Sequence, residues 1–457
     1  MDHEDDSFRS RESPKKESAL RQSRRTLALL LILFVCVPIA SADDETAISL
    51  TLKEALQRAV SLNPSTRSVE AGVGVAKLEK KQLRASVLPH LGFNARSTIN
   101  DRSVEFGTDQ GSITILPEYD WRYEFKLTQP VYSGGRATRA IMQADLGIDD
   151  AREAARANRE NILLTTTTDY LAVIRGGALV DVERKSVELA LLRRDQAEAF
   201  YEAGESTRVD LLRADTAIKA AERRLAAAEQ AREAAASRLR MDVAADVPIA
   251  VSPTSIDLPE LAPRQSLIER AASRRPEIRR AQLLVRFNEI EISKQRRKYL
   301  PVVTSEASLV TQAADFPAGQ YGSFTLNFDV PLFDSRDIAS QIALARERKK
   351  QADLALEQVE RAVREQIELA LIDLRTVETT LALARDQLAT AEAEYDQMFE
   401  LYRAQEATSL DLESSETSLA DARRAVATGE IDRDLAELAV WHAAGSLESI
   451  LMTEEVQ

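Results

Sequence analysis

Few residue types able to carry out enzymatic chemistry occur in this sequence of 457 residues. Downstream of an N-terminal leader the histidines are His90 and His442, and the one cysteine, Cys36, lies inside that leader. No nucleophile-elbow, zinc-protease or phosphate-loop motif occurs. The abundant carboxylates alternate with Lys and Arg, as on solvated helix faces. The sequence therefore predicts no enzyme, no catalytic or metal-binding residue and no cofactor.

Two aspartates stand out because they occupy the same place in a repeated motif. Asp210 ends the run 201–210 (YEAGESTRVD), and Asp411 ends the run 402–411 (YRAQEATSLD), 201 residues later. Each lies three residues after a threonine, which is the spacing of a helix N-cap and its partner. Both are therefore expected to cap a helix, and for Asp411 an acidic group facing an axial opening is the alternative.

These turns must be held at the ends of very long helices. Alternating apolar residues over 121–127 predict a strand. Pro130 is expected to end that strand because it has no N–H to donate. A helical pattern then runs to Phe200 without a proline, and the same elbow recurs at Pro331 before a helical pattern over 338–402.

The sequence is an internal duplication. Pro130 and Pro331 are 201 residues apart, whereas Pro89 and Pro301 are 212 residues apart. The second copy is therefore shorter between its two strands, where changes of length cost least. The expected domains are a signal peptide (1–42), a first repeat (43–246), a Pro-rich linker (247–264), a second repeat (265–445) and an acidic tail (446–457).

The N-terminus has the pattern of a secretory signal. A basic flank ending at Arg25 precedes the apolar run 27–37, and Ala40-Ser41-Ala42 forms a small-residue cleavage site. General and twin-arginine export both remain open. The net charge of −14, without basic clusters interleaved with aromatics, excludes nucleic acid as a partner.

Shorter elements complete each copy. Thr51–Glu54 and Ser266–Glu269 have the pattern of capping boxes at helix starts. A loop rich in Gly, Asp and Ser is expected up to Glu118. The expected strands are 90–98 and 121–127 in the first copy, and 302–310 and 324–330 in the second.

Four strands are too few to close a barrel, because the smallest single-chain outer membrane barrels have about eight. Each strand is near the ~9–11 residues that cross a bilayer, and an open edge in lipid leaves backbone groups unpaired. Three copies would supply twelve strands, which predicts a homotrimer with one shared barrel in outer membrane lipid. A small soluble sheet capped by helices is the alternative. The aromatic belt is expected at Trp121, Tyr123, Tyr321 and Phe324.

The fold class expected from these patterns is mainly α with a small antiparallel β part. In the second long helix, apolar positions advance by eleven residues from Leu356 to Ile367 and then by fours and threes to Tyr395. Such repeats are typical of nearly straight packing followed by a left-handed coiled coil. At ~1.5 Å per residue the helix would be ~100 Å long. This is far longer than a membrane is thick, so most of the protein is expected in water.

The order of these motifs resembles the TolC-like outer membrane efflux proteins. The motifs QPVYSGGR (Gln129–Arg136) and DVPLFDSR (Asp329–Arg336), with the two turns, carry a resemblance that covers about 50–445. It implies a trimeric channel-tunnel, with a twelve-stranded barrel in the outer membrane on a long α-helical barrel that crosses the periplasm. It also implies a periplasmic adaptor and an inner-membrane pump as partners, and export without chemistry of its own.

The resemblance further implies which residues form the site. The family's periplasmic entrance is closed at the second turn, matched here by Tyr402 and Asp411, with Asp210 as a partner. The sequence departs from the family at two positions of this site. Ser414 stands where the family has a second acid, and Ala407 stands where it has a basic lock residue. A ring of three Asp411 side chains is then expected to favour cations and to raise its own pKa values by repulsion. The adaptor is expected to contact Gly204, Glu205, Ser206, Gln405, Glu406 and Ala407, where Gln405 replaces the family's glycine.

Two alternative functions stay open. A duct for type I protein secretion would share these motifs, because the pump and the adaptor select the cargo. A periplasmic coiled-coil scaffold would account for the helices and the acidity, but not for two strand pairs with aromatic faces.

Overall fold

The computed structural model describes residues 48–108, 111–252 and 258–452. The chain divides into two units, Met1–Ile48 and Ser49–Gln457, and the architecture below is that of the second unit. The expected signal peptide, with Cys36 and its cleavage site, lies outside the described residues.

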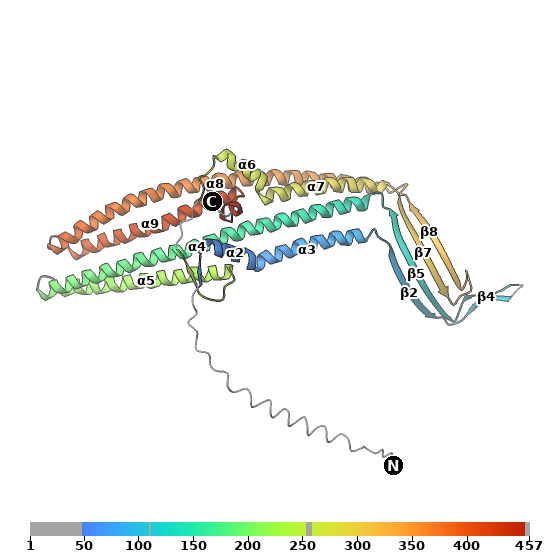
Figure 1. The fold of residues 1–457 in the computed structure, drawn as a ribbon, viewed down its shortest axis with the longest axis horizontal. Coiled ribbons are helices and arrows are strands. Elements are labelled where there is room, and N and C mark those ends of the chain that lie inside the picture. Colours follow the sequence, from blue (N-terminus) through green and yellow to red (C-terminus); the bar gives the residue numbers. More distant parts are fainter. Residues whose placement is uncertain (1–47, 109–110, 253–257, 453–457) are drawn as a thin grey trace, which may run out of the picture. The chain divides into compact units, whose positions relative to one another are not determined.

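The same order of helices and strands occurs twice (Figure 1). Each copy has two shorter helices, two long strands and two long helices. The first copy contains α2 (Leu52–Leu62), α3 (Pro64–Ala85), β2 (His90–Ile99), β5 (Tyr119–Tyr132), α4 (Arg136–Glu202) and α5 (Arg208–Asp242). The second contains α6 (Arg264–Arg274), α7 (Pro276–Arg296), the short 3-10 helix η1 (Arg297–Tyr299), β7 (Val302–Gln312), β8 (Gln320–Asp329), α8 (Asp337–Arg403) and α9 (Ser409–Ala443).

The four long strands form one antiparallel sheet in the order β2-β5-β7-β8. Pro130 was expected to end its strand, and that expectation is wrong, because β5 continues to Tyr132. The ladder tolerates Pro130 because the register with β7 shifts between Pro130 and Tyr132 and the ladder with β2 ends at Thr128. A proline without an N–H therefore lies where β5 has only one neighbour.

The expected loop between the first two strands instead contains a hairpin. Strands β3 (Val104–Thr108) and β4 (Gly111–Leu116) pair with each other, with a register shift between Val104 and Glu105. Asp315, in the shorter connection of the second copy, exchanges two hydrogen bonds with Thr114 of β4, at 3.0 and 3.2 Å. The extra length of the first copy thus forms a paired extension rather than an irregular loop.

The helices α4 and α8 have 67 residues each, which at ~1.5 Å per residue is about 100 Å. Each folds back through a short turn into α5 or α9, giving hairpins α4–α5 and α8–α9 (Figure 1). The two turns share a left-handed residue, Gly204 with φ 77° and Gln405 with φ 62°. The missing glycine in the second turn therefore leaves the backbone geometry in place.

The structure at the helix starts confirms one predicted capping box and contradicts another. Thr51 and Glu54 form the expected reciprocal capping box of α2. The predicted box at Ser266–Glu269 is wrong, because α6 begins at Arg264 and Ser266 lies inside the helix. Pro263 at the N-cap of α6 fixes the backbone angle without a side-chain hydrogen bond.

Buried apolar side chains join the two repeats around the middle of α4. One cluster brings together Leu163 of α4, Leu267 of α6, Ile367 of α8 and Trp441 of α9. The expected acidic tail begins inside this cluster, because Leu447 of α10 (Leu447–Leu451) is fully buried there. Residues 453–457 of that tail lie outside the described part of the chain.

The segment between the repeats makes contacts with the rest of the fold at both ends. Strand β6 (Ile249–Val251) pairs beside Leu50 of β1 (Ile48–Leu50), and the Tyr170 hydroxyl donates to the Leu50 and Ser252 carbonyls. Leu258 packs against the apolar cluster at the other end. The expected linker is therefore ordered on both sides of residues 253–257, which lie outside the described residues.

Gly176 of α4 lies against the backbone of α5 at Arg232. A Cβ at this position would lie 2.9 Å from Arg232 Cα, whereas a Cβ at Gly177 would have no atom within 4 Å. Gly176→Ala is therefore expected to destabilise the protein by about 1–3 kcal/mol through overpacking. Gly177→Ala, the matched control, is expected to be neutral or to stabilise by about 1 kcal/mol because alanine favours helix. Denaturant unfolding followed by the fluorescence of the buried Trp441 measures both, and equal effects would contradict the prediction.

Asp242, at the end of α5, carries a pH-sensitive charge. Burial and the neighbouring carboxylate of Asp169 raise the pKa of Asp242 to about 6. A raised pKa means that the folded state holds the proton more tightly, so this stabilisation is complete below pH ~4 and is lost as the pH rises through ~6.

Asp242→Asn is therefore expected to flatten the fall in unfolding free energy between pH ~4 and ~7. Thermal melts across that range measure the effect. The control is Asp181→Asn, whose carboxylate is 70% exposed and pairs within its own helix. Equal pH dependence of Asp242→Asn and the wild-type protein would contradict the assignment.

Candidate functional site

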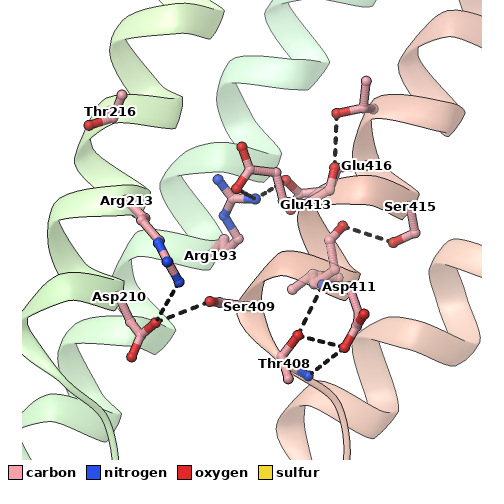
Figure 2. A network of polar contacts seen from close by, with 12 residues as sticks. Arg193, Asp210, Arg213, Thr216, Thr408, Ser409, Asp411, Glu413, Ser415 and Glu416 are labelled. Carbon is pink, nitrogen blue, oxygen red and sulfur yellow. Dashed lines mark hydrogen bonds and ion pairs between the residues drawn. The ribbon is translucent and has the colours of Figure 1, made fainter.

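The two helical turns lie side by side. Gln405 Nε2 donates to Glu205 Oε2 at 2.6 Å, which joins the tip of one hairpin to the tip of the other. Ser409 Oγ donates to Asp210 Oδ1 at 3.3 Å. The two turns are therefore in contact within one chain, and Ser409 and Asp210 face each other (Figure 2).

Asp210 forms the expected helix cap and also contacts the other hairpin, while its role at the channel entrance stays a prediction. It caps α5, because the Thr207 hydroxyl donates to its Oδ2 at 2.7 Å and the Thr207 N–H at 3.2 Å. It also accepts from Ser409 of α9 and lies 3.6 Å from Arg213 Nη1. These hydrogen bonds, that of the Thr207 hydroxyl first, lower the pKa of Asp210. The carboxylate stays charged where the hairpins meet.

Asp411 is the matching cap of α9. The Thr408 hydroxyl donates to its Oδ2 at 2.6 Å and the Thr408 N–H at 3.0 Å. These hydrogen bonds lower the pKa of Asp411. Among the described residues, no hydrogen bond of Asp411 reaches Tyr402 or Asp210. The cap interpretation is thus confirmed, while the ring of three Asp411 side chains stays a prediction.

Tyr402 is buried, with 6% of its surface exposed, and its ring meets Phe200 edge-on at 5.7 Å. Phe200 precedes the first turn, so the pair packs the end of α8 against the end of α4. Burial raises the pKa of the Tyr402 hydroxyl. Tyr402 therefore packs one hairpin end against the other as a neutral side chain.

The predicted adaptor-contact residues surround this apolar pair. Gly204, Glu205, Gln405 and Glu406 are exposed, and Ser206 and Ala407 are half-buried. Their backbone amides complete the turns, as where Glu205 N–H donates to Phe200 O at 2.8 Å. The adaptor contact stays a prediction.

Three charged residues of the long hairpins are buried, although the charges of these helices were expected on solvated faces. Arg193 and Glu183 of α4 are buried, and so is most of Glu416 of α9. Arg193 Nη1 donates to Glu416 Oε2 at 2.9 Å, and burial raises the pKa of Glu416. The spacing of Val180, Glu183, Val187, Ala190 and Arg193, in steps of three and four, could have revealed charges on a core-facing stripe.

The other expected site is the sheet, which has one apolar and one polar face. Phe93 lies opposite Phe125 and Phe125 opposite Leu309, so these apolar side chains share a face. They are exposed, Phe93 by 58% and Leu309 by 67%. The apolar face contains Leu91, Phe93, Phe125, Leu127, Leu309, Phe324 and Leu326, and the polar face contains Asn94, Glu124, Lys126, Glu306, Ser308 and Ser323.

The predicted aromatic belt is only partly on the apolar face. Trp121 and Tyr123 lie there with ring centres 5.4 Å apart, and Phe324 is on the same face. Tyr321 is not, because it lies opposite Val310, which lies opposite Glu124 on the polar face. The correction follows from alternation along β8, since residues an odd number of positions apart point to opposite faces.

Among the described residues, no helix has the length and apolar character needed to cross a bilayer. Within the same ranges no group of three or more His, Cys, Asp or Glu side chains could hold a metal ion.

Comparison with known proteins decides the family. The family described as outer membrane efflux protein matches residues 55–241 and 267–446, which include both repeats. The chain belongs to the outer membrane efflux protein family. It is therefore an outer membrane protein, and its family is one of efflux proteins rather than of enzymes.

Individual relatives support the assignment across most of the chain. The outer membrane efflux protein BepC of Brucella suis is 23% identical over 376 residues, which cover 80% of this chain and 79% of the relative. The outer membrane protein OprJ of Pseudomonas aeruginosa is 28% identical over 370 residues, covering 76% and 75%.

Solved structures support the fold. The MtrE outer membrane channel of Neisseria gonorrhoeae, in its open state, aligns with a TM-score of 0.72 at 17% identity, over 89% of this chain and 90% of that chain. A membrane protein from Pseudomonas aeruginosa aligns with a TM-score of 0.75 at 19% identity, over 86% and 93%. The expected fold class, mainly helical with a small antiparallel sheet, is confirmed.

Proposed function

We propose that this chain is one subunit of a homotrimeric channel that forms a passive exit duct across the periplasm and the outer membrane. Its substrates would be delivered by an inner-membrane pump through a periplasmic adaptor. The observation that carries the proposal is the sheet, whose exposed apolar face is joined directly to helices of about 100 Å.

The open edges of the sheet support closure of the barrel by further copies of the chain. Among the described strands, β2 and β8 are the two ends of the order β2-β5-β7-β8, so each is paired on one side only. Unpaired backbone groups in lipid cost several kcal/mol each. Pairing β8 of one copy with β2 of the next satisfies them, and three copies make a closed barrel of twelve strands. Four strands from one copy fall short of the about eight of the smallest barrels.

The faces of the sheet indicate which side meets lipid. The exposed aromatic and aliphatic side chains of the apolar face suit the hydrocarbon of the outer membrane. The opposite face carries the ion pair between Lys126 and Glu306, at 3.0 Å, which suits a water-filled interior. A soluble coiled-coil scaffold would leave the apolar face in water, so the sheet favours the channel over the scaffold. A type I protein secretion duct would have the same barrel and stays the second candidate.

The direct test is the mass of the detergent-extracted protein. The mature protein, expressed with its own leader, is extracted from the outer membrane fraction and measured by light scattering. We expect a protein mass three times that of one chain, and ion conductance when the trimer is placed in planar bilayers. A detergent-free elongated monomer or dimer would contradict the channel and favour the scaffold.

Asp411→Ala is expected to weaken the cation preference of the channel and its block by divalent cations. Three Asp411 carboxylates near the axis would concentrate cations, and mutual repulsion would oppose the lowering of their pKa by Thr408. Asp411→Asn keeps an acceptor for the Thr408 hydroxyl and separates loss of charge from loss of the cap. Reversal potentials in a salt gradient measure the preference. The control is Glu406→Gln, which removes an exposed charge from the same turn. An unchanged reversal potential in both Asp411 variants would contradict the ring.

A further inference from the structure

Three basic side chains form a row on α3, the helix that leads into the sheet. Lys77, Lys81 and Arg84 are spaced by four and three residues, so they share one face of the helix. All three are exposed, and among the described residues none of them has an ion pair. The neighbouring Lys80, by contrast, pairs with Asp145 of α4. The row is therefore a set of cations that the contacts within one chain leave free.

The row lies on one definable face of the helical wall. Next to the sheet this wall consists of α3, α4, α7 and α8, packed in that order. The helices α6 and α10 cover one of its faces through a shared apolar cluster. We call this the outer face, because the lumen of the proposed duct needs the other one.

Ion pairs show that the row of α3 points to the outer face. Glu70 of α3 lies 3.9 Å from Arg159, which in turn binds Glu448 of α10 at 3.0 Å. Lys77 and Arg84 follow Glu70 by seven and fourteen residues, which is close to two and four turns. They therefore share the face of Glu70, on the side where α10 lies.

A second basic row lies on α8, at the other edge of the wall. Arg346 and Lys350 are exposed, and neither has an ion pair within the described part of the chain. Glu368 of α8 pairs with Arg264 of α6, so it marks the outer face of α8. Lys350 precedes Glu368 by eighteen residues, which is five turns. The row of α8 therefore points to the outer face as well.

Both rows lie close to the proposed lipid boundary. Arg84 is in the last turn of α3, and Arg346 is nine residues into α8, about 14 Å at ~1.5 Å per residue. Exposed apolar side chains lie between the rows and the strands, with Leu88 57% exposed, Leu332 95% and Phe333 88%. Cations beside such an apolar rim are the arrangement expected where a membrane surface carries anionic headgroups.

Closing the barrel would bring the two rows together. The helix α3 leads into β2, and α8 follows β8. If β8 of one copy pairs with β2 of the next, as proposed, the row of α8 lies beside the row of α3 from the adjoining copy. Each boundary between copies then carries five exposed cations without ion pairs, although the chain has a net charge of −14.

We propose that Lys77, Lys81 and Arg84, with Arg346 and Lys350 of the adjoining copy, bind the headgroups of anionic phospholipids in the inner leaflet of the outer membrane. The ammonium and guanidinium groups donate to the lipid phosphates, and the apolar rim enters the boundary of the acyl chains. The headgroups thereby hold the barrel at a fixed depth. The site rests on the proposed channel function, which places the sheet in the outer membrane.

The test measures the lipid preference of the purified mature protein. The detergent-solubilised trimer is titrated with phosphatidylglycerol or with zwitterionic phosphatidylethanolamine, and native mass spectrometry counts the bound lipids. The wild-type protein is expected to bind phosphatidylglycerol about tenfold more tightly, and K77Q/K81Q/R84Q is expected to lose most of this preference. R346Q/K350Q is expected to weaken the preference of the trimer as well.

The matched control is K185Q/R208Q/R223Q. It removes three positive charges from the hairpin α4–α5, which lies on the far side of the belt from the sheet. Their side chains are also exposed and without ion pairs among the described residues. This variant is expected to keep the lipid preference of the wild-type protein, because its charges lie far beyond the ~8–10 Å over which charges act in salt solution.

The outcomes separate the lipid site from the channel function. Equal affinity of the wild-type protein for both lipids, or an equal loss in K77Q/K81Q/R84Q and the control, would overturn the site. Release of phosphatidylglycerol by an excess of inorganic phosphate would assign the cations to a soluble anion and overturn it too. A protein that is not a trimer would reject the channel, whereas a preference that depends on the row of α3 would still support lipid binding.

Discussion

Backbone hydrogen bonding at the edges of one small sheet constrains most of this structure. The strands β2, β5, β7 and β8 satisfy one another internally, but the outer edges of β2 and β8 are left open. If the apolar face lies in lipid, as proposed, water cannot hydrate an open edge. In the proposed channel, further copies of the chain would pair with both open edges. The long helices α4 and α8 follow the sheet directly.

The long helices are constrained by the need to bury part of their surface. A helix of 67 residues is stable only if a stripe along it is buried. Here each long helix packs against its own return helix, and α2, α6 and α10 cover the middle around Leu163 and Trp441. The apolar clusters become small toward the turns. Near the proposed entrance, the contact between Phe200 and Tyr402 and the polar contacts of the turns join the two hairpins.

Local and long-range interactions have different roles at the turns. Thr207 with Asp210 and Thr408 with Asp411 are local, since each pair spans three residues and starts a helix. The hydrogen bond from Ser409 to Asp210, and those of Arg193 and Glu183 to α9, join residues that are 199, 223 and 241 positions apart. The local contacts shape each turn, and the long-range contacts determine how the two hairpins lie against each other.

The sequence by itself determined the elements and their repetition, because periodicity, capping spacing and proline positions act within a few residues. It was enough to predict α4, α8, the four long strands and the cap at Asp411. The sequence was not enough where a residue far away in the chain determines the local structure. Pro130 stays in β5 because the ladder with β2 has already ended, and Tyr321 falls on the polar face through the register of β8. The burial of Glu183 and Arg193 depends on arginine and glutamate side chains of another hairpin, and only the tertiary structure brings those partners within bonding distance.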